Sequence, residues 1–362
     1  MVDIVVDIQG VWLPNKGAEL MARATVDELG RRLRGARFTS PAQGPDAARA
    51  ALGMPSRPAR SPGKERLLRL VGLGPRHTHV VDISGFGYGD YWGPKKAKQR
   101  AGAAIRAGLP TYLLPQAFGP FSEPGLVAEM RRIVAGARFI GARDRASLEH
   151  LRSLGVSREL RAHPDITIGL DASKRRIERP AGPYACLVPN AMTVRSGALD
   201  EAALVDLYAR CAKICREAGV EPIVVLHEPE ADERLARQLV ERAGGLRVVA
   251  LEDALDIKAL LAGARCIATA RFHGLVSGLS SGVPSLAIGW SHKYEELLAD
   301  FDCPELLYAG DPQAFVARME TILRPDGAVE LAARIGAAAS RHKAALSALW
   351  DDVAEDMLRT SR

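Results

Sequence analysis

The sequence has little of what marks membrane-spanning or nucleic-acid-binding proteins. Aromatic residues make up only 5% of the 362 positions, and the formal charge of +6 comes from basic residues spread along the chain. A groove that reads nucleic acid needs Lys and Arg clustered together, so the sequence argues against a nucleic-acid partner. No uninterrupted apolar run approaches the roughly 20 residues that a helix needs to span a bilayer.

Cysteines are also few, and they are odd in number and scattered: Cys186, Cys211, Cys215, Cys266 and Cys303. This pattern is typical of reduced thiols in a cytosolic protein and not of a disulfide scaffold. Cys211 and Cys215 are four residues apart on an expected helix, but no second pair of ligands lies nearby in the sequence. Core packing is therefore favoured over a metal site. Since a carboxylate cluster for Mg²⁺ is not evident either, we expect no metal.

The first residues, MVDIVVDIQG, lack the basic and apolar regions of a signal peptide, so we expect a cytoplasmic protein. One stretch, residues 61–77, is basic and amphipathic, as segments on anionic membrane surfaces are. An ordinary surface helix is the commoner explanation. Peripheral contact with the inner face of the membrane stays open as the alternative.

Hydrophobic residues make up 47% of the chain, and its length is sufficient for two domains that each bury a core. Short apolar runs alternate with helical patterns throughout, which is typical of α/β proteins with parallel sheets. We expect two Rossmann-like domains, residues 1–175 and 183–330, that face each other across a cleft. A C-terminal helix within 331–362 is expected to pack back on the first domain.

Three expectations about local structure bear on the candidate sites. The pattern predicts a helix over 95–107, a loop over 115–120, and a loop that carries Asn190 and Arg195 after a strand at 184–189. Gly85-Phe86-Gly87-Tyr88-Gly89 follows a strand, and its glycines are expected either to let the backbone approach a substrate or to form a turn. Its spacing differs from the dinucleotide fingerprint, so a nicotinamide cofactor is not supported.

The most informative stretch runs over residues 264–301. It reads as a strand, a helix of small residues and a second strand, with Arg271, Phe272 and His273 at the end of the first strand and Gly274 opening the helix. Ligands of open parallel sheets lie beyond the carboxyl ends of the strands, and a helix start attracts anions. We therefore expect an anion site beside a histidine that titrates near neutral pH. A structural Arg–His pair is the alternative.

Two other positions resemble this one. Arg143 also stands between a strand and a helix, where a salt bridge to Asp144 or Glu149 is the alternative explanation. Asn15 and Gly17 lie in the first strand-to-helix turn, where a helix cap followed by a turn glycine is the commoner reading.

Four blocks, in this order, resemble the polysaccharide pyruvyl transferase family. They are Asn15, Gly17 and Glu19; Gln116 with Gly119-Pro120; Arg143, Asp144, Ser147, Leu151 and Gly155; and Arg271, His273, Gly282, Pro284 and Lys293. Each block is weak alone, but four in order over most of the chain are much more specific. The chain departs from the family pattern at residues 84–87, where members tend to have consecutive glycines, and at Ala18, where many carry an acidic residue.

The resemblance implies a GT-B-like transferase that moves pyruvate from phosphoenolpyruvate, its donor substrate, to hydroxyls of a sugar or glycan, with a lipid-linked acceptor left open. It implies no cofactor, and it places the acceptor on the first domain and the donor on the second. His273 would then exchange protons and Arg271 would hold one anionic group of the donor. The residues expected to bind substrate are Arg143, Lys293, Phe272, Gly274, Asn190, Arg195, His227, Asn15, Gly17, Glu19, Gly85 and Gln116. A GT-B glycosyltransferase that uses a sugar nucleotide and a non-catalytic glycan-binding relative are the alternatives.

Overall fold

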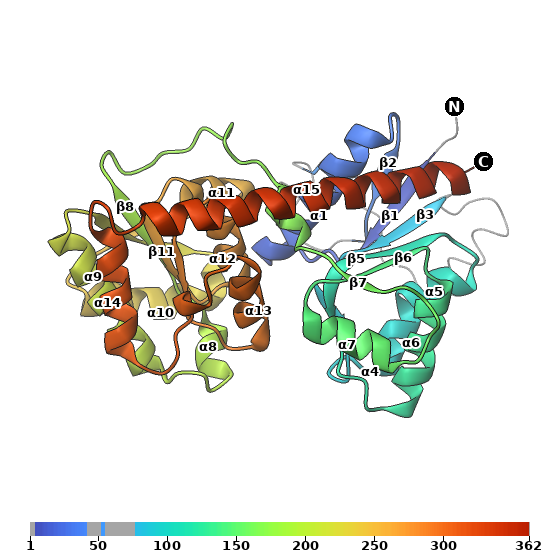
Figure 1. The fold of residues 1–362 in the computed structure, drawn as a ribbon, viewed down its shortest axis with the longest axis horizontal. Coiled ribbons are helices and arrows are strands. Elements are labelled where there is room, and N and C mark those ends of the chain that lie inside the picture. Colours follow the sequence, from blue (N-terminus) through green and yellow to red (C-terminus); the bar gives the residue numbers. More distant parts are fainter. Residues whose placement is uncertain (1–3, 42–51, 55–76, 362) are drawn as a thin grey trace. The chain divides into compact units, whose positions relative to one another are not determined.

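A computed structural model describes residues 4–41, 52–54 and 77–361 of the chain (Figure 1). The chain divides into two compact units. The first comprises Met1–Pro14, Ala18–Ile166 and Ala344–Arg362, and the second comprises Asn15–Gly17 and Thr167–Lys343. Each unit contains its own parallel sheet and its own helices. The α/β class with two parallel sheets, predicted from the sequence, is confirmed.

The first unit is built on a seven-stranded sheet with the order β2-β1-β3-β5-β6-β7, in which β4 pairs separately with β5. Its strands are β1 (Val5–Gln9), β2 (Arg37–Thr39), β3 (His79–Asp82), β4 (Phe86–Tyr88), β5 (Thr111–Phe118), β6 (Phe139–Ala142) and β7 (Arg161–Ala162). Its helices are α1 (Lys16–Arg32), α4 (Gly93–Gln99), α5 (Ala101–Arg106), α6 (Pro124–Gly136), α7 (Arg145–Ser153) and the last part of α15 (Val329–Thr360).

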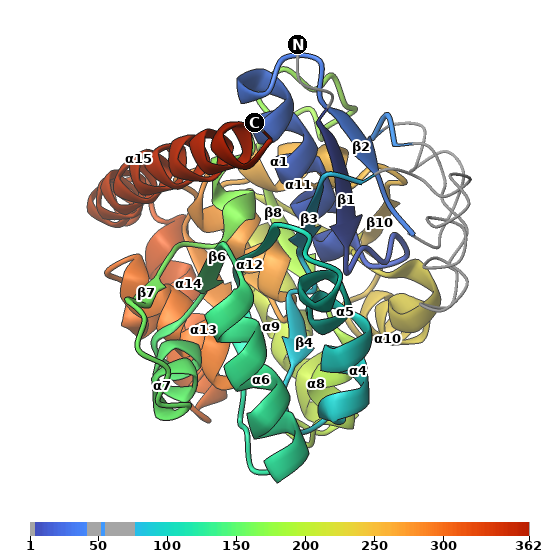
Figure 2. The same cartoon turned by 90° about the vertical axis from the view of Figure 1, so that its right-hand side faces the viewer.

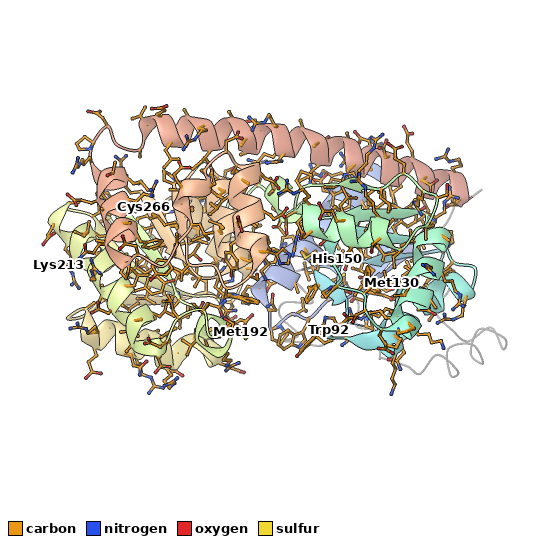
Figure 3. All side chains as sticks on the ribbon, turned by 60° about the horizontal axis from the view of Figure 1, so that its bottom comes forward. Trp92, Met130, His150, Met192, Lys213 and Cys266 are labelled. Atoms are coloured by element: carbon orange, nitrogen blue, oxygen red, sulfur yellow. The ribbon has the colours of Figure 1, made fainter. Side chains whose placement is uncertain are left out.

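Strand β5 explains why helices cover both faces of this sheet. All of its residues are buried, as expected for a central strand of a parallel sheet. Leu113 packs into a core cluster that includes Met130 of α6, which is labelled in Figure 3. The neighbouring Tyr112 points to the opposite face, where its hydroxyl donates a 2.8 Å hydrogen bond to Asp356 of α15.

The second unit has a five-stranded sheet with the order β10-β9-β8-β11-β12. Its strands are β8 (Tyr184–Val188), β9 (Glu221–Leu226), β10 (Arg247–Ala250), β11 (Cys266–Thr269) and β12 (Ser285–Ala287). Its helices are η1 (Ile166–Gly169), α8 (Ala191–Arg195), α9 (Glu201–Glu217), α10 (Pro229–Arg242), α11 (Ala254–Ala262), α12 (Phe272–Leu279), α13 (His292–Asp300), η2 (Pro304–Leu306), α14 (Pro312–Leu323) and the first part of α15.

Both sheets contain a topological switch point. This is a pair of neighbouring parallel strands from which the chain adds its next strand on opposite sides of the sheet. In the second unit it lies between β8 and β11. In the first it lies between β1 and β3, which are labelled side by side in Figure 2. Open α/β sheets bind ligands at the carboxyl ends of the strands at such points. The loops that follow these four strands are therefore where functional residues are expected.

The structure differs from the sequence-based expectation around Gly87. Phe86–Tyr88 is not a turn but the short strand β4, which pairs with the end of β5. Because β5 extends to Phe118, most of the loop predicted over 115–120 is strand as well. Such pairings join residues about thirty positions apart, so the local glycine pattern did not reveal them.

Two helix predictions also need correction. The helix predicted over 95–107 is broken at Arg100, whose backbone angles (φ −93°, ψ −119°) are not helical. Its guanidinium instead reaches Ser84, to whose hydroxyl Nη1 donates a 2.5 Å hydrogen bond. The loop predicted after β8 contains the short helix α8, because the side chain of Asn190 caps its first turn.

All five cysteines lie in the described part of the chain, where they are buried and form no disulfide. Cys266, labelled in Figure 3, belongs to β11. Burial raises the pKa of the Cys186 thiol, which therefore stays protonated at neutral pH and behaves as a small apolar side chain.

Within the described ranges, no helix is long and apolar enough to cross a bilayer. Apart from His77, the basic segment 61–77 lies outside the described residues, so its proposed contact with a membrane surface stays a prediction.

Candidate functional site

The site of the second unit begins where β11 passes into α12. Arg271 precedes the first helical residue and has extended backbone angles. Its N–H donates a 3.0 Å hydrogen bond to the hydroxyl of Thr269, which in turn donates one of 3.2 Å to the carbonyl of Arg271. Gly274, in the first turn, lies so close to Thr269 that a Cβ would come within 2.7 Å of its hydroxyl oxygen. Thr269 thus holds the helix start at the tip of the strand.

Arg271 is buried between two carboxylates. Its Nη1 lies 2.9 Å from Oε2 of Glu228, and its Nη2 forms an ion pair with Asp232. Asp232 is fully buried, and its other oxygen accepts a 3.0 Å hydrogen bond from the N–H of Ala191. Charge-assisted hydrogen bonds of this kind fix the plane of a guanidinium. The Nε of Arg271 is buried and has no hydrogen-bond partner in the described part of the chain, so one donor is left for a ligand.

Asn190 joins the two strands of the switch point. Its Nδ2 donates a 2.9 Å hydrogen bond to the carbonyl of Ala270, just beyond β11, while its Oδ1 caps α8 by accepting from the N–H of Met192. Tyr294 donates to the same carbonyl at 2.7 Å. Asn190 therefore orders the backbone where β11 passes into α12. Arg195, the last residue of α8, is exposed.

His273 packs directly against the Asn15-Lys16-Gly17 segment. A Cβ placed on Gly17 would lie 2.1 Å from Nδ1 of the imidazole. The Nδ2 of Asn15 donates a 2.6 Å hydrogen bond to Glu228, and Lys16 donates one to the carbonyl of Glu252. Asn15 and Gly17 of the first sequence block are thus part of the second unit, and Gly17 contacts His273 of the fourth block.

His227 lies at the end of β9 and is buried. Burial lowers its pKa well below the ordinary value of 6.5, and the positive charges of Arg271, His273 and Lys16 lower it further. The imidazole is therefore uncharged at neutral pH. If His227 binds substrate, as the resemblance implies, it does so as a neutral imidazole, because burial opposes its protonation. Its Nε2 is buried without a hydrogen-bond partner among the described residues.

Lys293 is held beside the start of α12 by aromatic rings. Its ammonium nitrogen lies 4.3 Å from the ring centroid of Trp290, 5.2 Å from that of Phe272 and 5.7 Å from that of Tyr294. Cation–π contacts at these distances are attractive. The lysine of the fourth block thus joins Phe272 next to Arg271 and His273.

In the first unit, the second and third sequence blocks contact each other at the ends of β5 and β6. The N–H of Arg143 donates a 3.0 Å hydrogen bond to the carbonyl of Gln116, and its Nη1 lies 3.2 Å from Oδ2 of Asp165. Asp144 caps α7 by accepting from the N–H of Ser147, whose hydroxyl accepts from the N–H of Phe118 at 2.9 Å. The Arg-Asp-x-x-Ser spacing therefore ties α7 to the end of β5.

Asp82, at the end of β3, organises the polar groups nearby. Its Oδ1 accepts hydrogen bonds from the N–H and hydroxyl of Ser84 at 3.0 and 2.6 Å, and from Nε2 of Gln116 at 3.4 Å. Its Oδ2 accepts one of 2.7 Å from Tyr88. Burial and the charge of Asp82 raise the pKa of Tyr88, which keeps the proton that it donates. A Cβ on Gly10 would lie 2.5 Å from backbone atoms of Ser84, so the loops after β1 and β3 touch.

The remaining candidates, Glu19 and Gly85, also belong to the first unit. Glu19 is buried in the first turn of α1. Gly85 has a φ of +70°, a conformation that favours glycine. The predicted residues thus form two sets. One is in the second unit: Asn15, Gly17, Asn190, Arg195, His227, Arg271, Phe272, His273, Gly274 and Lys293. The other is in the first unit: Glu19, Gly85, Gln116 and Arg143.

Sequence reasoning missed the carboxylates of both sets. Glu228 and Asp232 gave a partial signal, because they follow a strand and open a helix on the carboxyl side of the sheet. That they meet Arg271 depends on the strand order β9-β8-β11, which a single sequence does not specify. Asp82 ends the observed strand β3, but its role depends on strand β4, which the sequence did not predict.

Comparison with known proteins gave one family and one type of fold. A family model described as polysaccharide pyruvyl transferase matches residues 15–292. No curated protein sequence matches the chain.

Several solved structures are similar over nearly the whole chain. A putative UDP-N-acetylglucosamine 2-epimerase from Listeria monocytogenes is 12% identical with a TM-score of 0.64, and the match covers 97% of each chain. The UDP-GlcNAc 2-epimerase of Neisseria meningitidis, solved with UDP-GlcNAc bound, is 12% identical with a TM-score of 0.64, over 98% of this chain and 99% of that one. MurG of Acinetobacter baumannii is 12% identical with a TM-score of 0.53, over 96% and 98%. At such identities the likeness shows the fold, which is of the predicted GT-B type.

Proposed function

Since this chain belongs to the polysaccharide pyruvyl transferase family, we propose that it transfers the pyruvyl group of phosphoenolpyruvate to two hydroxyls of a saccharide. The product is a pyruvate ketal, and phosphate is released. The family match over residues 15–292 carries this proposal, since it includes every candidate residue of both sets except Lys293, which follows it directly. The contact of His273 with the Asn15-Lys16-Gly17 segment supports it, because it joins the first and last family blocks in one place.

The donor has a carboxylate and a phosphate close together, so its site needs cations and oriented N–H groups. Arg271 supplies Nε beside the start of α12, and Lys293 stands next to Phe272. Arg271 is already paired with Glu228 and Asp232, so we expect it to act mainly through a directed hydrogen bond and less through net charge. Its plane is fixed before the donor arrives.

Ketal formation begins with a proton that moves to the methylene carbon of the donor, which makes the central carbon electrophilic. One hydroxyl oxygen of the acceptor bonds to that carbon and loses its proton. The bond to the phosphate oxygen then breaks, and the second hydroxyl oxygen takes its place. Of the two hydroxyl protons, one balances the proton placed on the methylene and the other leaves with phosphate or solvent. His273 is the group we assign to proton donation, because imidazole both gives and takes protons near neutral pH.

The proposal includes no cofactor and treats phosphoenolpyruvate purely as donor substrate. Arginine, lysine and backbone N–H groups are sufficient to bind its anionic groups. The acceptor is a sugar or glycan, free or lipid-linked, in the cytoplasm or at the inner face of the membrane.

The experiment is phosphate release from phosphoenolpyruvate in the presence of a panel of saccharides with neighbouring hydroxyls. We expect release that depends on one of the saccharides and that His273→Ala nearly abolishes, while Arg271→Ala weakens donor binding measured by calorimetry. His342→Ala is the control, since this half-buried histidine contacts Phe301 and Asp300, outside the candidate site. If His273→Ala keeps most of the wild-type rate, His273 is not the proton donor. Transfer from a sugar nucleotide, without phosphate release, would favour a glycosyltransferase.

A further inference from the structure

An exposed aromatic surface lies on the first unit, formed by Phe86, Tyr91 and Trp92. Their exposed fractions are 45%, 81% and 37%, in a chain where aromatic residues make up only 5%. Neighbouring exposed rings are unfavourable in water and mark sites where a partner binds. Tyrosine and tryptophan are enriched in such sites, because their rings combine apolar faces with a polar group.

The aromatic surface is ordered by its own hydrogen bonds. The indole N–H of Trp92 donates a 2.7 Å hydrogen bond to the carbonyl of Phe86, and the ring of Tyr91 lies edge-on to that of Trp92 with centroids 4.8 Å apart. Asp90, which precedes Tyr91 in the sequence, accepts a 2.9 Å hydrogen bond from the N–H of Ser122. Because the rings are fixed in advance, a ligand loses less entropy in binding to them.

This surface lies at the ligand-binding edge of the sheet. Phe86 opens β4, just beyond the carboxyl end of β3, and pairs with Ala117 of β5. The adjacent Gln116 is fully buried, and its Oε1 has no hydrogen-bond partner in the described part of the chain. A buried acceptor of this kind needs a hydrogen-bond donor, which a bound water or a hydroxyl of a ligand can supply. Trp12, 55% exposed, lies in the loop after β1 at the same edge.

Helix α4 places positive charge beside the rings, while the carboxylate of Asp90, next to Tyr91, is held by Ser122. Helix α4 packs against β4 and carries Lys95, Lys96 and Lys98, with no acidic residue in its first turn (Figure 2). The ammonium of Lys96 lies 4.2 Å from the ring centroid of Trp92, which is labelled in Figure 3. Lys95 and Lys98 are exposed. The partner that complements this surface carries negative charge.

We propose that Phe86, Tyr91 and Trp92, with Gln116 and the lysines of α4, bind the acceptor saccharide, and that this acceptor carries an anionic group such as a phosphate. That the bound saccharide is the acceptor rests on the proposed function, whereas saccharide binding itself is inferred from this surface. The flat rings stack on the C–H faces of a sugar, Gln116 accepts from one of its hydroxyls, and the lysines attract its charge. A membrane surface would also attract aromatic rings and lysines. It would leave the buried oxygen of Gln116 without a donor, which a sugar hydroxyl supplies.

The test is a glycan array that contains neutral and phosphorylated saccharides, probed with the full chain and with a Tyr91→Ala/Trp92→Ala double variant. We expect the full chain to bind phosphorylated saccharides and the double variant to bind them at least tenfold more weakly. The matched control is Leu358→Ala, since Leu358 is an exposed residue of the same unit. It belongs to α15, and Thr360 of that helix contacts His79 at the other end of β3. A Lys95→Glu/Lys98→Glu variant should lose affinity for phosphorylated saccharides and keep that for neutral ones.

The proposal is overturned if the full chain binds no saccharide, or if the double variant binds as well as the full chain. If the lysine variant binds phosphorylated saccharides as tightly as the full chain does, the claim that the acceptor carries an anionic group is overturned. In another outcome, phosphatidylglycerol vesicles capture the full chain but not the double variant, and the full chain binds no saccharide. That result would assign the surface to a membrane and would also overturn the proposal. Calorimetry with phosphoenolpyruvate separates the two claims, because the double variant should keep donor binding. Saccharide binding without any ketal formation would count against the proposed function alone.

Discussion

At the scale of single residues, the candidate site depends on contacts that leave little room for change. Gly17 lies against the imidazole of His273, although the two are more than 250 positions apart in the sequence. The family blocks that contain them could be recognised separately, but their contact could not be derived from their spacing. It follows from the way the Asn15-Lys16-Gly17 segment joins the second unit.

Gly17→Ala should reduce turnover at least tenfold and leave the fold intact. The added methyl would lie 2.1 Å from Nδ1 of His273, so the imidazole must move away from its position. Small displacements of a catalytic group cost large factors in rate. The measurement is the rate of phosphate release, with circular dichroism as the check on folding. Gly336→Ala is the matched control, because nothing lies within 4 Å of a Cβ at that position. An unchanged rate for Gly17→Ala would remove His273 from the reaction.

The pH dependence of stability should report on His227. Its pKa in the folded state lies well below 6.5, whereas in the unfolded chain it returns to about that value. Below pH 6.5 the unfolded state therefore binds more protons than the folded state. The free energy of unfolding falls progressively as the pH drops from about 6.5 toward the pKa of His227 in the folded protein. His227→Gln should reduce the fall in the urea midpoint between pH 7.5 and pH 5. His79 and His163, whose pKa values burial also lowers, remain in both proteins. Equal falls in the two proteins would contradict a neutral, buried His227.

At the scale of elements, the Arg271–Asp232 ion pair connects the starts of three helices. Arg271 precedes α12, Asp232 lies in the first turn of α10, and its second oxygen binds the N–H of Ala191 at the start of α8. All three helices begin at the carboxyl edge of the same sheet. The pair therefore sets the arrangement of the loops that form the site.

Asp232→Ala should destabilise the protein by about 3–5 kcal/mol, because it leaves the buried guanidinium of Arg271 with one carboxylate fewer. Urea denaturation measures the loss, and faster hydrogen exchange at Ala191 would place it locally. The control is Glu201→Ala, which removes the partner of the largely exposed Arg234 and should cost less than about 1 kcal/mol. A similar small cost for Asp232→Ala would mean that the ion pair does not order the site.

The same scale shows where sequence reasoning was reliable. Strand β6 (Phe139–Ala142) and helix α6 (Pro124–Gly136) belong to the alternation of strands and helices that the sequence predicts. Both follow from local apolar patterns and from proline or glycine at their ends. Strand β4 and the break at Arg100 were missed, because each depends on a contact with a distant segment.

At the scale of the whole molecule, alternation of strands and helices was sufficient to predict two parallel α/β units. The GT-B type of fold is confirmed by similar structures, and the family by the match over residues 15–292. Strand order, and with it the grouping of charged residues at each switch point, could not be predicted, since it depends on pairing between distant segments. The cleft and the division into acceptor and donor domains stay predictions.

The central claim is that the donor gives up phosphate while its methylene carbon receives a proton and its central carbon joins two hydroxyls. The most direct measurement is the reaction with phosphoenolpyruvate and a responsive saccharide in D₂O, followed by NMR of the product. The account predicts a ketal whose methyl group carries one deuterium from solvent, with one phosphate released for each ketal formed. A product that keeps the donor methylene, or a sugar transferred from a nucleotide while phosphoenolpyruvate is unchanged, would contradict it.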